Sequence, residues 1–188
     1  MQQNQYQSHQ KIGFRNCRTI FETCWQNLVS NFRIGQGFDA HKIIKGSKDF
    51  ILGGVTIDSE YEVIAHSDGD IICHVIIDAL LGACNMGDIG ELAPSNAEYK
   101  NISSIELLKK TLDMISKRGY RIVNIDLTYV GAEPRLEKFK KDIEANLAKE
   151  LDMNINDISC KATTTDGLGY EGSREGVSSH AIALVTKA

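Results

Sequence analysis

The chain of 188 residues has only two prolines, which argues against long disordered linkers. No apolar run approaches the roughly 20 residues that span a bilayer, so we expect no membrane-spanning segment and no membrane partner. No basic patch with interleaved aromatic residues occurs, and the formal net charge is -4, which argues against nucleic acid as the main partner. The length corresponds to about one domain with a sizeable core.

The five cysteines are scattered and form no CxxC pair: Cys17, Cys24, Cys73, Cys84 and Cys160. Their number and spacing argue against a disulfide framework and against a zinc site made of cysteine alone. Cys73 and Cys84 occur in an apolar stretch with helical periodicity, so we interpret them as small core residues.

Residues 1–31 differ in composition from the rest. They are rich in Gln and Asn, and they contain Lys11, Arg15 and Arg18 but only one acidic residue, Glu22. No long apolar segment marks a secretory signal. The composition is typical of the end of a transit segment for a plastid-type organelle, an apicoplast or a chloroplast. The alternative is a disordered extension on a cytoplasmic protein, and residues 32–188 form the domain in either case.

Hydrophobic periodicity predicts one α/β (α+β) domain. We expect it to be a mixed sheet packed by helices on one side. Phe32, Ile34, Gln36 and Phe38 share one side of a first strand. Capping-box patterns begin two of the expected helices, with Ser67 before Asp70 and Ser103 before Glu106. We expect strands at 50–57 (interrupted by Gly53-Gly54), 121–130, 157–164 and 178–186, and helices at 67–86, at 103–118 and after Pro134.

The segment Gly37-Phe38-Asp39-Ala40-His41 ends the first strand with two potential metal ligands. Residues i and i+2 of a strand point to the same side, so Asp39 and His41 can share one metal ion. Taken alone, the pattern also fits a surface aspartate and a loop histidine.

The helix expected at 67–86 is apolar almost all round, which predicts burial. Asp70, His74 and Asp78 nevertheless follow one stripe of it, at i, i+4 and i+8. Buried polar groups are costly unless they are paired or bound to metal. His74 is therefore either a metal ligand or a core histidine hydrogen-bonded to Asp70 or Asp78.

Together the two segments supply two histidines and a carboxylate, Asp39, His41 and His74. Three protein ligands are typical of a catalytic zinc that keeps its fourth position open. In that arrangement Asp70 or Asp78 would orient His74 through its second ring nitrogen.

Two further segments have the composition of ligand-binding loops. Gly87-Asp88-Ile89-Gly90 favours a tight loop whose backbone approaches a ligand, or else a plain helix-to-loop turn. Lys161-Ala162-Thr163-Thr164-Thr165-Asp166 ends in an oxygen ligand that suits Mg²⁺ on phosphates, or else is a Thr-rich strand followed by a turn.

The four segments occur in the order G-x-G-F-D-x-H, A-H-S-D-G-D, G-D-I-G and K-A-T-T-T-x-x-L-G-Y. Over roughly residues 32 to 187 the chain resembles the 2-C-methyl-D-erythritol 2,4-cyclodiphosphate synthase family of the non-mevalonate isoprenoid pathway. The resemblance implies a homotrimer with active sites between subunits. It also implies a phosphorus–oxygen lyase, in which the 2-phosphate of a CDP-linked methylerythritol attacks the β-phosphorus and CMP leaves.

The resemblance further implies Zn²⁺ on Asp39, His41 and His74, and a second ion, Mg²⁺ or Mn²⁺, on Asp166, where many members have Glu. His66 and Thr164 match the positions that stabilise the transition state. The implied substrate-binding residues are Asp39, His41, His66, Ser67, Asp88, Ile89, Gly90, Gly131, Ala132, Glu133, Pro134, Arg135, Leu136, Thr163, Thr164, Thr165, Asp166 and Tyr170.

One segment departs from the family. Members often read G-x-G-R-G-E-G where this chain reads Gly172-Ser173-Arg174-Glu175-Gly176, so the arginine is displaced by one residue. In the family that arginine lies near an apolar channel on the trimer axis that holds isoprenoid diphosphates. Two rival hypotheses remain: a zinc-dependent nucleotide-diphosphate hydrolase, and a non-catalytic trimeric binder of isoprenoid diphosphates with a structural zinc.

Overall fold

The structure is a computed structural model that describes residues 31–65, 67–93 and 102–188. The expectation of a leader segment at 1–31 lies outside these residues, apart from residue 31. His66 and Pro94 lie outside them too.

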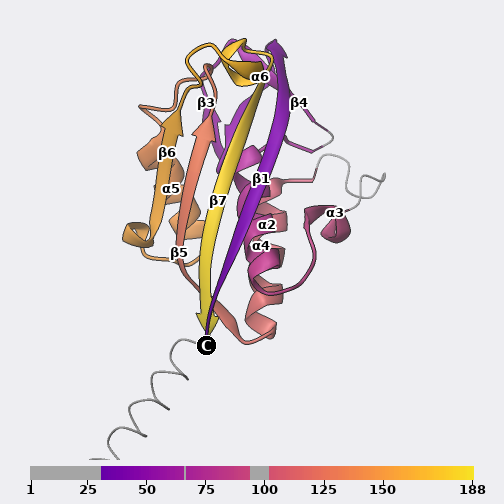
Figure 1. Ribbon diagram of the computed structural model, residues 1–188, viewed down its shortest axis with the longest axis vertical. Coiled ribbons are helices and arrows are strands. Elements are labelled where there is room, and N and C mark those ends of the chain that lie inside the picture. The colour runs from indigo at the N-terminus through magenta and orange to yellow at the C-terminus, as the bar shows by residue number, and fades with distance from the viewer. Residues whose placement is uncertain (1–30, 66, 94–101) are drawn as a thin grey trace, which may run out of the picture. The chain divides into compact units, whose positions relative to one another are not determined.

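A five-stranded mixed sheet with the order β4-β1-β7-β5-β6 forms the centre of the fold (Figure 1). β5 runs parallel to β6 and antiparallel to β7, and β1 runs antiparallel to β4. Alternate residues Ile125, Leu127 and Tyr129 of β5 are buried, which confirms the period-two pattern that predicted this strand. The strands are β1 (Phe32–Lys45), β4 (Tyr61–Ile64), β5 (Tyr120–Val130), β6 (Ile158–Thr163) and β7 (Gly176–Lys187).

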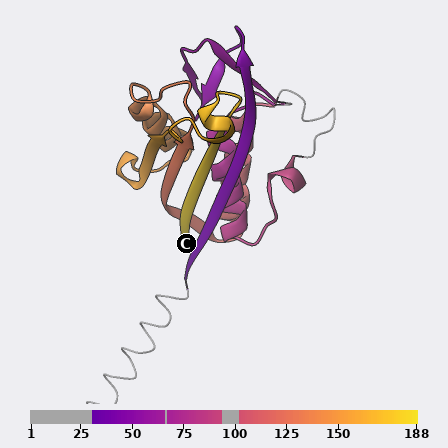
Figure 2. The same cartoon turned by 45° about the horizontal axis from the view of Figure 1, so that its top comes forward.

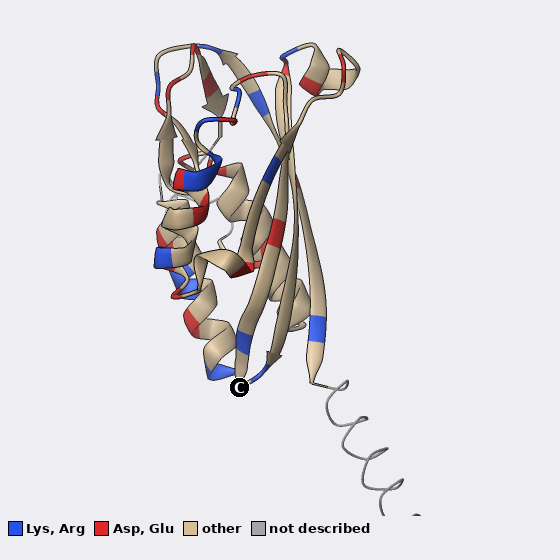
Figure 3. Cartoon of the chain, turned by 90° about the vertical axis from the view of Figure 1, so that its left-hand side faces the viewer, with Lys and Arg blue, Asp and Glu red and all other residues tan. Residues whose placement is uncertain are grey.

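Three helices, α2 (Ile71–Ala83), α4 (Ser104–Lys117) and α5 (Lys140–Glu150), pack on one face of this sheet. Figure 3 views the strands nearly edge-on and shows the longer helical ribbons on one side of them. The predicted mixed sheet with helices on one side is therefore confirmed. The short elements are α3 (Ile89–Leu92), η2 (Ile155–Asp157) and α6 (Gly169–Gly172), and α6 lies over the end of the sheet at which β7 begins (Figure 2).

The single interrupted strand expected at 50–57 is wrong. β2 (Phe50–Leu52) and β3 (Val55–Ile57) form an antiparallel hairpin, because Gly53 and Gly54 both adopt positive φ, 58° and 74°. Two consecutive residues with positive φ favour a tight hairpin turn, and glycine reaches that region without a steric penalty.

The helix expected from residue 67 begins later, at Ile71. Asp70 is its N-cap and accepts a hydrogen bond from the Cys73 amide at 3.1 Å, so Ser67 lies in the preceding loop. α2 packs on both β7 and α4, and its Ile71, Ile72 and Val75 are fully buried, as the all-round apolar pattern predicted. Polar side chains on α2 are therefore held within the core.

In the part of the chain that the structure describes, no helix has the length and apolar character needed to cross a membrane. Cys73 and Cys84 are free and buried, which confirms their prediction as core residues, and Cys160 is free and buried as well.

Candidate metal centre

On the side of β1 that faces α2, glycine residues precede the potential metal ligands in the sequence. A Cβ atom at Gly37 would lie only 2.0 Å from the carbonyl oxygen of Val75 on α2. The backbones of strand and helix are therefore in direct contact, which only glycine permits. This contact brings Asp39 and His41, on the same side of β1, within reach of His74.

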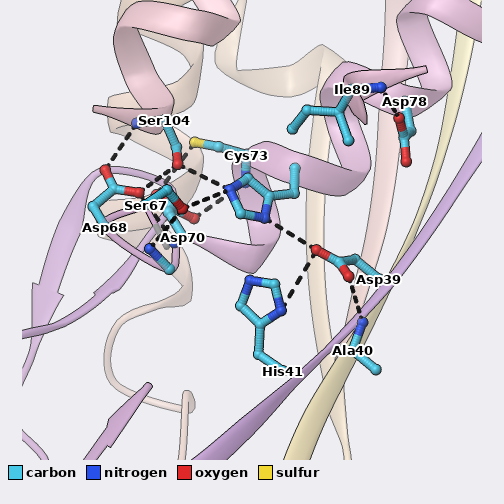
Figure 4. A network of polar contacts seen from close by, with 12 residues as sticks. Asp39, Ala40, His41, Ser67, Asp68, Asp70, Cys73, Asp78, Ile89 and Ser104 are labelled. Atoms are coloured by element: carbon cyan, nitrogen blue, oxygen red, sulfur yellow. Dashed lines mark hydrogen bonds and ion pairs between the residues drawn. The ribbon is translucent and has the colours of Figure 1, made fainter. Parts of the chain in front are cut away.

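Asp39, His41 and His74 offer ligand atoms that all lie within 4.8 Å of one another. Oδ2 of Asp39 is 3.0 Å from Nδ1 of His74 and 3.6 Å from Nδ1 of His41 (Figure 4). The two imidazole rings meet edge to face, with centroids 5.1 Å apart. The predicted triad is thus brought together from two elements that are distant in sequence.

The electrostatics of the triad favour a cation. Burial by itself raises the pKa of Asp39, but the hydrogen bond with His74 and the charges of both histidines outweigh it, and the pKa stays below its usual range. Nε2 of His41 is buried and has no hydrogen-bond partner. An ionised carboxylate, two imidazoles and an unpartnered ring nitrogen fit a divalent metal ion.

The far nitrogen of His74 is held by hydroxyl groups. Its Nε2 lies 3.1 Å from Oγ of Ser104 and 3.4 Å from Oγ of Ser67. The Ser104 hydroxyl in turn donates a hydrogen bond to Asp68 (Figure 4). No sequence pattern predicted this group, because Ser104 is 36 residues from Asp68 and lies outside the four motifs.

The expectation that Asp70 or Asp78 orients His74 is wrong. The carboxylate of Asp70 accepts the two amides of the β2–β3 turn, at 2.8 and 2.6 Å, and closes the start of α2. Asp78 accepts the amide of Ile89 at 2.8 Å. Both carboxylates are satisfied by backbone donors, so neither is available to the histidine.

The capping box expected at Ser103 does not form. Ser103 is the N-cap of α4, but its side chain makes no capping hydrogen bond. Asp68 is the side-chain acceptor at the start of α4 instead, because its Oδ2 accepts the Ser104 amide at 2.8 Å. A carboxylate from a distant loop thus satisfies a donor that the local sequence leaves open.

The loop Asp88-Ile89-Gly90 leads into the single turn of α3. Asp88 is the N-cap and accepts the amide of Glu91 at 2.9 Å, and Asp78 fixes Ile89 to the end of α2. The loop is therefore attached to the helix that carries His74.

A second group of predicted residues surrounds a cavity of about 490 Å³ at the β5–β6 edge of the sheet. The Gly131 amide donates to the Thr163 carbonyl at 3.1 Å, which joins the loop after β5 to the end of β6. The predicted residues that line this cavity are Gly131, Pro134, Arg135, Leu136, Thr163 and Thr164.

The remaining predicted residues lie beside these two groups. Ala132 donates its amide to the Glu171 carbonyl at 3.3 Å, and Glu133 lines a different cavity. Thr165 donates through its hydroxyl to the Leu168 carbonyl. Tyr170 lines a third cavity together with His41.

Asp166 does not join the triad. It is exposed, has φ of 53°, and accepts a hydrogen bond from the Thr164 hydroxyl at 3.5 Å. Among the described residues, the triad is the group found to suit a metal ion. β1 and β6 are also separated by β7 and β5, so three strand spacings, about 14 Å, lie between the triad's strand and Thr163.

Comparison with known proteins identifies one family that this chain resembles. The model of the YgbB family matches residues 32–186. The 2-C-methyl-D-erythritol 2,4-cyclodiphosphate synthase of Syntrophomonas wolfei is 42% identical over 157 residues, which cover 83% of this chain and 99% of the relative. That of Clostridium botulinum (strain Okra) is 45% identical over 154 residues, covering 81% and 99%.

Solved structures agree. The CDP complex of IspF from Plasmodium falciparum matches with a TM-score of 0.74 and 35% identity, over 84% of this chain and 97% of that one. The bifunctional IspDF of Campylobacter jejuni matches with a TM-score of 0.80 and 37% identity, over 84% of this chain and 42% of that one. The resemblance inferred from the four motifs is confirmed, and the chain belongs to the YgbB family.

Proposed function

We propose that the chain converts 4-diphosphocytidyl-2-C-methyl-D-erythritol 2-phosphate to 2-C-methyl-D-erythritol 2,4-cyclodiphosphate and CMP, in the non-mevalonate isoprenoid pathway. The observation that carries the proposal is the convergence of Asp39, His41 and His74 in a chain whose curated relatives bear that enzyme's name.

The reaction needs positioning more than base catalysis. An oxygen of the 2-phosphate attacks the β-phosphorus, the bond from that phosphorus to the bridging oxygen breaks, and the electron pair leaves with CMP. A phosphate monoester has a second pKa near about 6, so the nucleophile is largely ionised at neutral pH. The protein's task is to align the two phosphates and to neutralise their charge.

We assign Asp39, His41 and His74 to a Zn²⁺ ion, which leaves one position open for a phosphate oxygen. When bound, the zinc supplies Lewis-acid stabilisation of charge on the diphosphate. Asp166 is our candidate ligand for a second ion, Mg²⁺ or Mn²⁺. Replacing Asp166 with Ala should remove the Mg²⁺ dependence of the rate while zinc content stays unchanged, and a retained Mg²⁺ dependence would reject the assignment.

We assign the substrate to two half-sites. The loop Asp88-Ile89-Gly90 takes the methylerythritol, and the segment 131–136 with Thr163 and Thr165 takes the cytidine diphosphate. His66 and Thr164 stabilise the transition state, and Ser67 and Tyr170 complete the contacts.

The distance of about 14 Å between β1 and β6 supports a homotrimer, in which the zinc half-site of one subunit faces the cytidine half-site of its neighbour. The CDP bound to the related Plasmodium falciparum protein supports the cytidine assignment.

One incubation separates the cyclase from its two rivals. Purified protein is mixed with the CDP-linked substrate, Zn²⁺ and Mg²⁺, and the products are read by ³¹P NMR. We expect a cyclic diphosphate and CMP. Linear diphosphate with CMP would establish a hydrolase instead, and unchanged substrate would leave a binding protein with a structural zinc.

Two assignments concern regions outside the catalytic centre. We propose that Arg174 contributes to an axial channel for an isoprenoid diphosphate, and calorimetry with geranyl diphosphate on Arg174→Ala tests it. We also propose that residues 1–31 are a transit segment for a plastid-type organelle. A fusion of these residues to a fluorescent protein that stays in the cytoplasm would refute that.

A further inference from the structure

A chain of hydrogen bonds runs from His74 away from the metal centre. Nε2 of His74 lies 3.1 Å from Oγ of Ser104, and the Ser104 hydroxyl donates to Oδ1 of Asp68 (Figure 4). The other carboxylate oxygen of Asp68 accepts the Ser104 amide at 2.8 Å. Ser104 is 1% exposed and His74 is 9% exposed, so water does not compete freely for these partners.

The chemistry of the three groups sets the direction of each bond. A carboxylate only accepts hydrogen bonds, and a serine hydroxyl has a single proton to donate. Because Ser104 donates that proton to Asp68, its oxygen can only accept a hydrogen bond from His74. Nε2 of His74 must therefore carry a proton, and Nδ1, which faces Asp39 at 3.0 Å, is the ring nitrogen left to bind a metal ion.

We propose that Ser104 and Asp68 are positioning residues that hold His74 in its Nε2–H tautomer and so present Nδ1 to the divalent metal. The inference rests on the metal site of the proposed function. It adds that the carboxylate of Asp68, two hydrogen bonds away from His74, sets the tautomer and the orientation of this ligand. Such an arrangement increases the metal affinity of histidine ligands.

Ser67 is the alternative partner of Nε2, at 3.4 Å. Donation by Ser67 would require an unprotonated Nε2, whose lone pair would then face the acceptor oxygen of Ser104 at the shorter distance of 3.1 Å. Ser104→Ala separates the roles of the two serines, because it removes the Ser104 hydroxyl and leaves that of Ser67. The hydrogen bond from the backbone amide of residue 104 to Asp68 can remain.

The first experiment compares wild type, Ser104→Ala and the control Ser103→Ala. Ser103 is the adjacent residue, and its side chain makes no capping bond. The tautomer of His74 is read from ¹⁵N chemical shifts of the metal-free protein, and zinc affinity from competition with a chelator. We expect Nε2 of His74 to carry a proton in wild type and Ser103→Ala, with or without a second proton on Nδ1 facing Asp39. In Ser104→Ala we expect mixed tautomers and roughly 10- to 100-fold weaker zinc binding.

The second variant, Asp68→Asn, keeps the shape of the side chain. Its amide oxygen can still accept the backbone bond, but its NH₂ group then donates to Ser104, which releases the serine proton toward His74. We expect the population of the Nδ1–H tautomer to increase and zinc affinity to fall, although the hydroxyls of Ser67 and Ser104 are both still present. A merely structural contact would not move the tautomer.

The proposal is overturned if Ser104→Ala and Asp68→Asn both keep the Nε2–H tautomer, or if both bind zinc as tightly as Ser103→Ala. Should Ser104→Ala fail to fold, Asp68→Asn decides. The tautomer is measured without metal and without substrate, so an inactive wild type would count against the proposed function and not against this role of Ser104.

Discussion

Asp39 and His74 are 35 positions apart in the chain, yet Oδ2 of Asp39 lies 3.0 Å from Nδ1 of His74. The carboxylate accepts hydrogen bonds, and a neutral His74 with its proton on Nε2 would place a second acceptor opposite it. A proton or a metal ion between the two atoms resolves that repulsion. The pair is therefore the most direct structural sign of a cation site on this chain.

The first prediction concerns Asp39→Asn, which removes a charge with little change in shape. Zinc affinity should fall by more than the roughly 10- to 100-fold that is typical when an outer partner of a ligand is lost, because a ligand itself is removed. Titration calorimetry with zinc chloride measures it. Asp113→Asn on α4, whose carboxylate is 59% exposed, is the matched control and should bind zinc as wild type does.

The second prediction tests the contact between β1 and α2. In Gly37→Ala the new Cβ would lie 2.0 Å from the Val75 carbonyl, so the strand must shift away from the helix. Overpacking of this kind costs about 1–3 kcal/mol of unfolding free energy, and we expect zinc affinity to fall with it. Urea denaturation measures the loss of stability.

The control for that strand variant is Gly82→Ala, on α2 itself. A Cβ at Gly82 meets no atom within 4 Å, so this change should raise stability by about 0.4–1 kcal/mol. Equal effects of the two substitutions would show that backbone contact is not what requires glycine at position 37.

The third prediction concerns the face of the sheet opposite the helices. Ile34, Phe38 and Ile182 are 71%, 49% and 49% exposed there, and the ring of Phe38 lies 4.8 Å from that of His180. An apolar sheet face of this kind is typical of an interface between subunits. Ile182→Lys should therefore dissociate the proposed trimer, because it places a charge in that interface.

Sedimentation analysis distinguishes the outcomes. The wild type should have three times the chain mass of 20.8 kDa, and Ile182→Lys should sediment at the mass of one chain with an unchanged circular dichroism spectrum. Ile155→Lys, at a position 43% exposed on η2, is the control and should remain trimeric. A monomeric wild type would contradict the trimer directly.

The fourth prediction is a pH dependence at Glu144. Burial raises the pKa of this carboxyl, but hydrogen bonds from Lys141 at 2.6 Å and from the Cys160 amide at 2.9 Å outweigh it, and the pKa is lowered below 4.5. A lowered pKa means that the ionised group stabilises the fold above the unfolded-state pKa. That stabilisation is lost as pH falls through the folded-state pKa.

Glu144→Gln should therefore reduce the unfolding free energy by about 1 kcal/mol at pH 7. The gap between variant and wild type should close as the pH falls below 4.5. Urea denaturation at pH 7 and at a series of acidic pH values measures both. A gap that stays constant across this range would show that the charge of Glu144 contributes nothing.

The fifth prediction concerns the loop before α3. Asp78→Ala removes the acceptor of the Ile89 amide, and the loss of one hydrogen bond, about 0.5–1.5 kcal/mol, should speed amide exchange up to about tenfold. Hydrogen–deuterium exchange of the peptide containing residues 87–92 measures it, with the peptide of α4 as internal reference. The KM for the substrate should rise with it, since the loop is our methylerythritol half-site.

Local pattern was sufficient for most of the fold. The alternation in β5 and the all-round apolar run of α2 predicted their element types and their burial, since both depend on periodicity within one segment. Errors occurred at element ends. Gly53-Gly54 turned the chain into a hairpin, and Asp70 moved the start of α2, because turn and cap geometry depends on which donors and acceptors meet in space.

The sequence by itself selected the candidate ligands, since the D-x-H of β1 and the single histidine of α2 point to Asp39, His41 and His74 without any coordinates. It also contained the signal for their approach, because Gly35 and Gly37 alternate with the same period as Asp39 and His41. Only the tertiary structure decided what supports them. Ser104 contacts His74 across 30 residues and Asp68 across 36, and no local pattern specifies hydrogen bonds that form only when distant segments pack together.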